Sequence, residues 1–340
     1  MTQGKLKSLE SVSNKRGIIS AAAMDQRGSL RKSIAKAKGV SEQEISREEI
    51  QDFKTEVTKA LTPHASAILL DPEYGLPAAR ARAKGSGLLL AYEVTGYDHK
   101  IGGRMPALIP GYSVKKLKED GGDCVKLLLY WTPYEDAGIN EKKKELVRKV
   151  GDECAREDIA FFLEPVGYDP KNDVKDVNFA KKKPEIVIST IKEFSKDEYG
   201  VDVLKLEVPI EMKFTAGTRA FKGEKAYDTE EAKKLFRQAA QASPKPFIYL
   251  SAGVSQDEFC ESLELAAAAG TDYSGVLCGR ATWQDGVPVF AKGGRKALAE
   301  WLEKDGVKNI QQLNKVLDKG AKPWWVKYGG REKIQVAQAR

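Results

Sequence analysis

The feature that most constrains the fold is an alternation, repeated eight times, between short apolar runs and longer helical patterns. Each apolar run is 5–9 residues long and nearly continuous in apolar character, which is typical of parallel strands covered on both faces. The predicted strands are residues 17–25, 65–71, 87–93, 123–131, 159–164, 201–208, 246–251 and 275–279. Eight such units predict an α/β protein with a (β/α)8 TIM-barrel fold. A doubly wound open sheet is the structural alternative, because periodicity alone does not prove closure.

Helical patterns fill the segments between these runs. Ser41-x-x-Glu44 and Ser46-x-x-Glu49 are capping boxes that predict a helix continuing to about Leu61. Further helices are predicted over residues 113–121, 141–157, 184–194, 228–242, 255–269, 294–304 and 309–317. Three strand-to-helix connections are long, at residues 94–112, 167–183 and 209–227. In a barrel all three lie on the C-terminal face, where substrates bind.

The composition is that of a single globular domain. Of the 340 residues, 41% are hydrophobic, and no linker or internal repeat divides the chain. We expect a barrel catalytic domain over residues 1–320 and a basic, frayed C-terminal tail over residues 321–340. Residues 319–340 hold six basic residues against Glu332, a balance of +5 out of the net charge of +7. The rest of the chain is nearly neutral, which favours a local anion site over a nucleic-acid-binding face.

Other residue types indicate the cellular context. The polar N-terminus lacks the apolar core of a secretory signal, and no apolar run approaches the ~20 residues that a membrane-spanning helix needs. The cysteines are far apart and form no CxxC pair, which indicates a reduced, cytoplasmic protein. Two histidines, His64 and His99, are too few for most multi-histidine metal sites, so we expect no metal or other cofactor.

Charged residues occur within the predicted strands, where a barrel should be apolar. Lys205 lies between two leucines, and Lys126, Glu164, Asp25 and Glu93 interrupt other apolar runs. Burial lowers the pKa of a lysine in general, and a neutral lysine can attack a carbonyl to form a Schiff base. From spacing alone Lys126 competes with Lys205 for that role, and either lysine could instead pair with an acid. Glu164 is interpreted as such a partner or as a general acid/base, and Asp25 and Glu93 could cap backbone amides.

The last two predicted strands end in small residues followed by hydrogen-bond donors. Ser251-Ala252-Gly253 follows the seventh strand and Gly279-Arg280 follows the eighth. Barrel enzymes often bind phosphate at these two loops through backbone amides that glycine leaves accessible. An arginine adds a planar fork suited to phosphate oxygens. The alternative is a pair of tight turns with a surface arginine.

Several segments together resemble the class I tagatose-1,6-bisphosphate aldolases. They are AAAMDQRGSL, HASAILLDPEYGLPA, CVKLLLYW, FFLEPVGYD, YGVDVLKLEVP, IYLSAGVS and GVLCGRATW. The likeness runs from about residue 9 to residue 325. It implies a metal-independent (β/α)8 enzyme that cleaves a ketohexose bisphosphate to dihydroxyacetone phosphate and glyceraldehyde 3-phosphate.

The resemblance also implies roles for single residues. Lys205 would form the Schiff base, and Glu164 would act as acid/base. Asp25 and Gln26 would line the pocket, and Lys126 would orient substrate oxygens or tune the nucleophile.

The same resemblance implies a phosphate holder and leaves other points open. Ser251 and Arg280, with backbone at Gly253 and Gly279, would hold the phosphate nearer the Schiff base. The second phosphate is not located, the segment ending at Arg340 lies outside the family pattern, and related enzymes act on other phosphorylated or sulfonated ketoses.

Other functions have their own requirements. A metal-dependent aldolase would need a convergent set of ligands. A sugar-phosphate-sensing barrel would bind without turnover, and a barrel isomerase would need no strand lysine. The expected partner is a small sugar phosphate, with neither nucleic acid nor membrane, and a homo-oligomer is one of the assemblies left open.

Overall fold

Eight parallel strands close into a barrel, which confirms the predicted fold. The computed structural model describes residues 1–97 and 102–337. The barrel strands are β1 (Ile19–Ala23), β2 (Ala67–Leu70), β3 (Gly87–Ala91), β4 (Cys124–Trp131), β5 (Ala160–Gly167), β6 (Val203–Leu206), β9 (Phe247–Leu250) and β10 (Gly275–Cys278). Their order around the barrel is β1-β10-β9-β6-β5-β4-β3-β2, and every neighbouring pair is parallel. The open-sheet alternative is therefore wrong.

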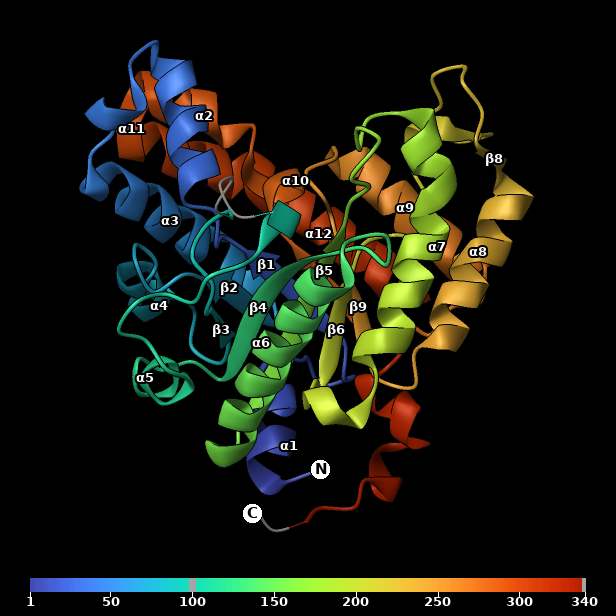
Figure 1. Cartoon of the computed structure of the whole chain (residues 1–340). Helices are drawn as coiled ribbons and strands as arrows, with labels where there is room; N and C mark the ends of the chain where they lie inside the picture. The colour runs from blue at the N-terminus through green and yellow to red at the C-terminus, as the bar shows by residue number, and fades with distance from the viewer. Residues whose placement is uncertain (98–101, 338–340) are drawn as a thin grey trace.

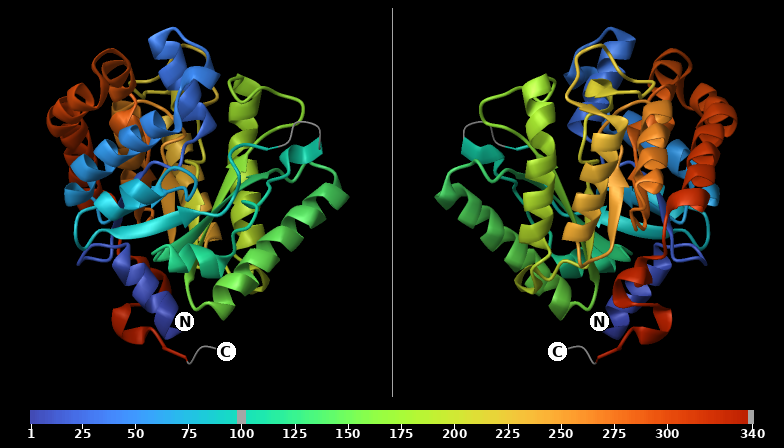
Figure 2. Two further views of the ribbon diagram at one scale, coloured as in Figure 1. Left: turned by 90° about the vertical axis from the view of Figure 1, so that its left-hand side faces the viewer. Right: turned by 90° about the vertical axis from the view of Figure 1, so that its right-hand side faces the viewer.

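Helices surround this barrel, as Figures 1 and 2 show. Their bounds are α1 (Gln3–Ser11), α2 (Gly28–Lys38), α3 (Arg47–Leu61), α4 (Leu76–Ala81), α5 (Val114–Glu119), α6 (Ala137–Arg156), α7 (Val177–Phe194), α8 (Thr229–Ala242), α9 (Gln256–Ala268), α10 (Arg280–Trp283), α11 (Gly286–Trp301) and α12 (Val307–Gly320). The side chains of Ser46 and Glu49 cap the start of α3 reciprocally, as the sequence predicts.

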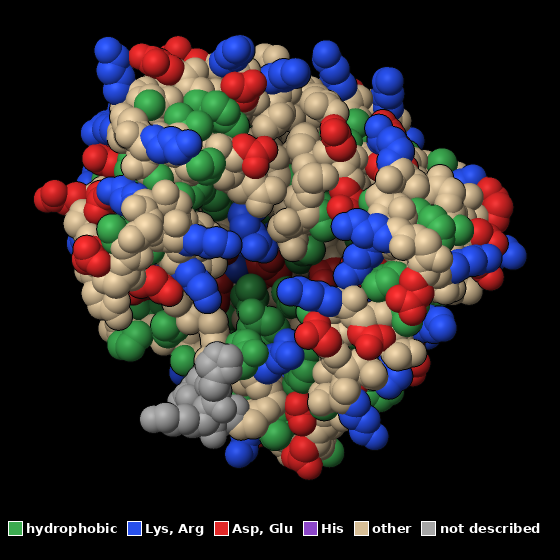
Figure 3. Space-filling view, turned by 90° about the horizontal axis from the view of Figure 1, so that it is seen from above, with side chains coloured by type: hydrophobic (Ala, Val, Ile, Leu, Met, Phe, Trp, Pro, Cys, Tyr) green, Lys and Arg blue, Asp and Glu red, His purple; other side chains and the backbone are tan. Residues whose placement is uncertain are grey.

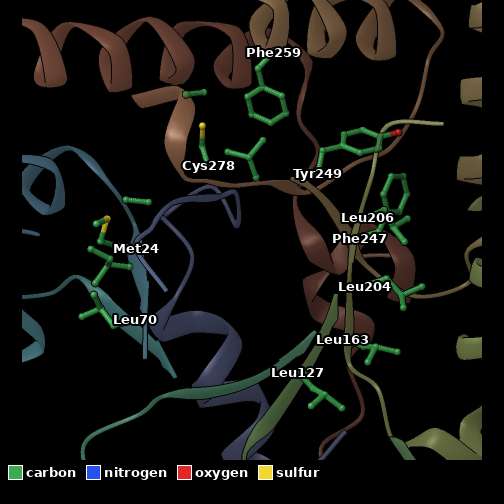
Figure 4. Close-up of a cluster of buried hydrophobic side chains, with 14 of the residues drawn as sticks. Met24, Leu70, Leu127, Leu163, Leu204, Leu206, Phe247, Tyr249, Phe259 and Cys278 are labelled. Atoms are coloured by element: carbon green, nitrogen blue, oxygen red, sulfur yellow. The ribbon is translucent and has the colours of Figure 1, made fainter. Parts of the chain in front are cut away.

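Two hydrophobic cores follow from the two faces of the strands. The larger core lies between strands and helices, and Figure 4 shows Leu127, Leu163 and Leu204 contributing to it from three neighbouring strands. The smaller core fills the barrel interior with residues such as Ala21 and Phe162. Because successive side chains alternate between the faces, the parity of a residue along its strand decides which core it enters.

The structure moves the start of the helix predicted over residues 184–194. Pro184, the first residue of that prediction, lies inside α7, which begins seven residues earlier at Val177. Proline has no N–H to donate to the carbonyl four residues before it. Here the hydroxyl of Tyr227 donates to the Ala180 oxygen at 2.6 Å. Tyr227 belongs to a two-residue strand, β8 (Tyr227–Asp228), which pairs with β7 (Thr215–Ala216) in the loop after β6.

The C-terminal segment is ordered, so the expectation of a frayed tail is wrong for the described part. Trp324, in the 3-10 helix Trp324–Tyr328, is fully buried in the inner core. Its backbone N–H donates to the Gly17 oxygen at 2.9 Å. Further along, Ala337 donates to the oxygen of Met1 at 2.9 Å. Figures 1 and 2 show both termini together beneath the barrel, at the end where the strands begin. Burial of a large indole and backbone pairing with the N-terminus account for the order of this basic segment.

Candidate active site

The period of the strands directs three charged residues into the barrel. Lys126, Glu164 and Lys205 each follow an inner-core residue by two positions: Cys124, Phe162 and Val203, respectively. They therefore point to the same interior as those residues. The strands β4, β5 and β6 are neighbours, with Leu128 opposite Glu164 in the register. Sequence parity and strand order together bring the three charges to one place.

Lys126 is the centre of the charged cluster. Its Nζ lies 2.9 Å from Asp25 Oδ2, 2.6 Å from Glu93 Oε1 and 2.7 Å from Glu164 Oε2. The side chain is fully buried, which disfavours an ammonium, but these carboxylates raise the pKa of Lys126 well above its ordinary value. Burial likewise opposes ionisation of Asp25, yet Lys126 and Lys205 hold the pKa of Asp25 well below its ordinary value. Lys126 is therefore a fixed cation.

Lys205 has different surroundings. Its Nζ lies 2.8 Å from Glu164 Oε1, so the two oxygens of Glu164 contact the two lysines separately. Lys205 is 3% exposed and lines the large cavity, whereas Lys126 does not line it. The amine of Lys205 is therefore the one that faces the space in which a ligand would bind.

That cavity opens at the C-terminal ends of the strands and has a volume of about 1180 Å³. Figure 3 looks into it from above and shows lysine and arginine side chains along its walls with acidic side chains deeper inside. Of the residues singled out in the sequence, it gathers Asp25, Gln26, Glu164, Lys205, Ser251, Gly253, Gly279 and Arg280. Lys126 lies behind this lining and acts on the cavity through the three carboxylates that it contacts.

The loops after β9 and β10 have the backbone that an anion site needs. Ala252 and Gly253 both have positive φ, +49° and +81°. A Cβ at Gly253 would lie 2.5 Å from Cζ of Arg280, so glycine allows the guanidinium to lie against the loop. Gly279 precedes Arg280 at the start of α10. The two loops predicted to act together are therefore in contact.

Gln26 is oriented toward the second of these loops. A Cβ at Gly279 would lie 3.3 Å from the Gln26 side-chain nitrogen. Its buried side-chain oxygen has no hydrogen-bond partner among residues 1–97 and 102–337. A buried unpaired acceptor beside a cavity is suited to a ligand hydroxyl.

Sequence reasoning missed Lys54, on α3. Its fully buried Nζ donates to the oxygens of Met24 and Gln26 at 2.6 and 2.8 Å and to Asp71 at 2.6 Å. It therefore holds the backbone on both sides of Asp25. The available signal was its place on the apolar face of α3.

Glu93 and Arg104 add to what the sequence indicated. Glu93 caps a backbone amide as one interpretation expected, accepting from Leu128 N–H at 3.0 Å, and it also pairs with Lys126. Arg104 lines the cavity from the connection between β3 and β4, where no periodic pattern marks it.

The described residues offer little support for a metal-dependent mechanism. His64 precedes β2, at the end of the barrel opposite the cavity, and His99 lies outside the described residues. Within residues 1–97 and 102–337, no group of three or more His, Cys, Asp and Glu side chains could hold a metal ion. No helix in the same ranges has the length and apolar character needed to cross a membrane.

Comparisons with known proteins agree on one family. Residues 19–285 match the model of the DeoC/LacD family aldolases. A tagatose 1,6-diphosphate aldolase of Listeria monocytogenes serotype 4a (strain HCC23) is 50% identical over 339 residues, which cover 99% of this chain and 98% of the relative. Tagatose 1,6-diphosphate aldolase 1 of Enterococcus faecalis (strain ATCC 700802 / V583) is 50% identical over 322 residues, covering 94% and 97%. Among solved structures, a fructose-bisphosphate aldolase from Plasmodium falciparum has a TM-score of 0.67 at 13% identity and covers 93% and 94%, a likeness of fold.

Proposed function

This chain belongs to the DeoC/LacD family of aldolases, and from that premise we propose that it is a metal-independent class I aldolase. Its substrate is a ketohexose bisphosphate such as tagatose 1,6-bisphosphate, which it cleaves reversibly to dihydroxyacetone phosphate and glyceraldehyde 3-phosphate. The names of the relatives at 50% identity support this substrate. The observation that carries the proposal is a lysine, Lys205, that reaches the cavity beside a carboxylate it shares with a second, inaccessible lysine.

The contrast between the two lysines supports Lys205 as the nucleophile. A Schiff base requires a neutral amine with access to the substrate carbonyl. Lys126 contacts three carboxylates, has a raised pKa and lies outside the cavity lining. Within residues 1–97 and 102–337, Lys205 has the single carboxylate Glu164 as its ion-pair partner, and it faces the cavity. Proton transfer from Lys205 to Glu164 Oε1 would leave the amine neutral while Lys126 keeps its charge.

Cleavage then follows from the placement of Glu164. Neutral Lys205 attacks C2 of the open-chain ketose. The proton that Glu164 received passes to the leaving hydroxyl, so loss of water gives a protonated iminium ion and restores the carboxylate of Glu164. The carboxylate of Glu164 takes the proton of the C4 hydroxyl, the C3–C4 bond breaks, and its electron pair forms an enamine. The aldehyde product leaves, the enamine carbon is protonated, and water releases dihydroxyacetone phosphate and restores the lysine. The fixed charge of Lys126 stabilises the carboxylate form of Glu164.

The phosphate next to C1 is assigned to the loops after β9 and β10. Ser251, the amides around Gly253 and Gly279, and the guanidinium of Arg280 form this holder, and Asp25 and Gln26 contact substrate hydroxyls. We propose that residues 1–320 form the catalytic domain and that the basic segment 321–340 closes the end of the barrel at which the strands begin, where Trp324 is buried in the inner core. The free, buried cysteines support a cytoplasmic location.

Borohydride trapping tests the nucleophile. The protein is incubated with tagatose 1,6-bisphosphate and sodium borohydride, digested, and analysed by mass spectrometry. We expect the reduced adduct on the peptide that contains Lys205. Lys205→Met should abolish trapping and lower kcat by about 10³-fold or more. Lys222→Met, at an exposed lysine on the cavity rim, is the matched control and should keep both. An adduct on Lys126, or none, contradicts the assignment.

Two further measurements separate the proposal from its rivals. Full activity in excess chelator is expected, and loss that a divalent ion restores would favour a metal-dependent aldolase. Tagatose 1,6-bisphosphate should have the highest kcat/KM in a panel of phosphorylated and sulfonated ketoses. A higher kcat/KM for another ketose would change the assigned substrate but leave the proposed Schiff-base mechanism in place. Binding without turnover of any ketose would favour the sensing barrel.

A further inference from the structure

We infer that Arg104 forms a second anion site in the cavity, which takes the phosphate at the far end of the ketose and sets the preference for a bisphosphate over a monophosphate. This inference rests on the proposed function and assigns a residue to the phosphate that the sequence leaves unplaced.

The arginines that line the cavity differ in whether they have an acidic partner. Four arginines line the cavity. Arg27 pairs with Glu73 at 2.6 Å, and Arg219 lies 3.5 Å from Glu261. Arg104 and Arg280 have no carboxylate within salt-bridge distance in residues 1–97 and 102–337. A guanidinium beside a cavity and without an acidic partner is suited to a phosphate ligand.

The order of the strands places Arg104 and Arg280 on opposite sides of the barrel. Arg280 follows β10, next to the Ser251 loop after β9, whereas Arg104 lies in the connection between β3 and β4. In the closed barrel, the pair β9–β10 lies across from the pair β3–β4. The two unpaired arginines therefore belong to opposite walls of the mouth. Lys205 on β6 and Glu164 on β5 lie on the arc between these walls, so a ligand that joins both arginines passes the reacting groups.

Aromatic rings hold the guanidinium of Arg104 in place without neutralising it. Its Cζ lies 4.4 Å from the ring centroid of Tyr168, 5.5 Å from that of Tyr97 and 5.8 Å from that of Tyr130. Tyr130 is on β4 and also lines the cavity. Rings orient an arginine through their faces and leave its N–H groups available for an anion. The guanidinium is thus held in position, and its positive charge is not neutralised by a carboxylate of the described residues.

The backbone at this point is also specialised. Arg104 has φ +53°, a conformation that costs free energy in any residue with a Cβ. The preceding Gly103 has φ +76°, and a Cβ there would lie 2.3 Å from the Ile139 side chain. The hydroxyl of Tyr168 lies 3.0 Å from the Gly103 oxygen. The surrounding contacts maintain a strained conformation that directs Arg104 to the cavity.

The test compares two substrates that differ only at the far phosphate. Tagatose 1,6-bisphosphate and tagatose 1-phosphate are assayed with the wild-type chain and with Arg104→Met. The variant should lose about 50-fold in kcat/KM for the bisphosphate, mostly through KM, and change less than about threefold for the monophosphate. Arg104→Lys, which keeps the charge without the fork, should recover part of the loss. Arg219→Met is the matched control, since Arg219 is paired with an acid, and should not alter the substrate ratio.

The outcomes separate this inference from the proposed function. Equal losses for both substrates would mean that Arg104 supports the loop, and no loss for either would mean that it does not contact substrate. Either result overturns the inference, as does a wild-type chain that does not prefer the bisphosphate. In these cases trapping at Lys205 would still support the aldolase. If the wild-type chain neither cleaves a ketose nor is trapped by borohydride, the proposed function is wrong, and the inference about Arg104 is rejected with it. Thermal unfolding of each variant confirms that it is folded.

Discussion

Lys143 on α6 is fully buried, and its ammonium lies 3.0 Å from the hydroxyl of Tyr168. No carboxylate lies within salt-bridge distance of it in residues 1–97 and 102–337. The other buried lysines differ, because each contacts an acid: Lys126, Lys54, Lys183 and Lys205. Burial accordingly lowers the pKa of Lys143 to about 8, with Glu135 opposing and Arg104 reinforcing this direction. Carboxylates instead raise the pKa values of the buried Lys126 and Lys183, so a contacting acid decides the direction of the pKa shift among these three lysines.

A pH dependence of stability follows from this residue. Between about pH 8 and its ordinary pKa, 10.5, Lys143 binds more protons in the unfolded chain than in the folded chain. Its contribution to the free energy of unfolding therefore rises as pH rises through this window. From about pH 7.5 to about pH 9.5 the wild-type chain should gain roughly 2 kcal/mol more than Lys143→Met.

Urea unfolding at both pH values measures this difference. Lys144→Met is the control, because Lys144 is partly exposed and lies 3.4 Å from Glu193. It should follow the wild type. If Lys143→Met also follows the wild type, the pKa of Lys143 is not lowered.

Parity explains which site residues the sequence could predict. Lys126, Glu164 and Lys205 stand out because each interrupts an apolar strand, and strand position fixes their direction. The sharing of Glu164 between the two lysines depends on the pairing of three strands, which one strand's sequence does not contain. The sequence does not predict Arg104, because the loop that contains it has no periodic pattern of apolar residues.

At the scale of elements, α7 and the loop after β6 stabilise each other. Pro184 leaves the Ala180 oxygen without its usual helical donor, and Tyr227 of β8 supplies a replacement at 2.6 Å. The contact ties the chain after the Lys205 strand to the helix that precedes that strand. The sequence could not predict it, because proline is most common in the first helical turn and the predicted helix therefore begins at Pro184.

The pair gives a double-mutant prediction. Tyr227→Phe removes the donor and should lower the free energy of unfolding by about 1–2 kcal/mol, since a carbonyl is left unpaired. In a Pro184→Ala background the new N–H can bond to the Ala180 oxygen. The same substitution should then cost less than about 0.5 kcal/mol. Chemical denaturation of the four proteins measures the coupling, and an equal cost in both backgrounds would assign the effect of Tyr227 to packing.

At the scale of the whole molecule, the two ends of the barrel have separate tasks. The C-terminal end carries the cavity and its charges, and the other end is closed by α1 and by the segment around Trp324 (Figures 1 and 2). The eight strands were predictable because each is apolar apart from a few charged residues. The closure of the barrel end by Trp324 was not predictable, because a tryptophan in a basic segment does not indicate which surface of the folded protein it covers. Only the folded topology brings residues 17 and 324 together.

This division predicts that stability and turnover respond separately to a change at the closed end. Trp324 is fully buried among inner-core residues such as Ile19 and Leu9, so Trp324→Ala should lower the free energy of unfolding by about 3–5 kcal/mol. Lys205 and Glu164 are at the other end, so kcat measured well below the melting temperature should change less than about twofold. Lys322→Ala, at an exposed neighbour, is the control for both quantities. A fall in kcat while circular dichroism shows the variant folded would mean that the floor of the barrel positions the reacting groups, because the inner core is continuous from Trp324 to the strand residues that precede them.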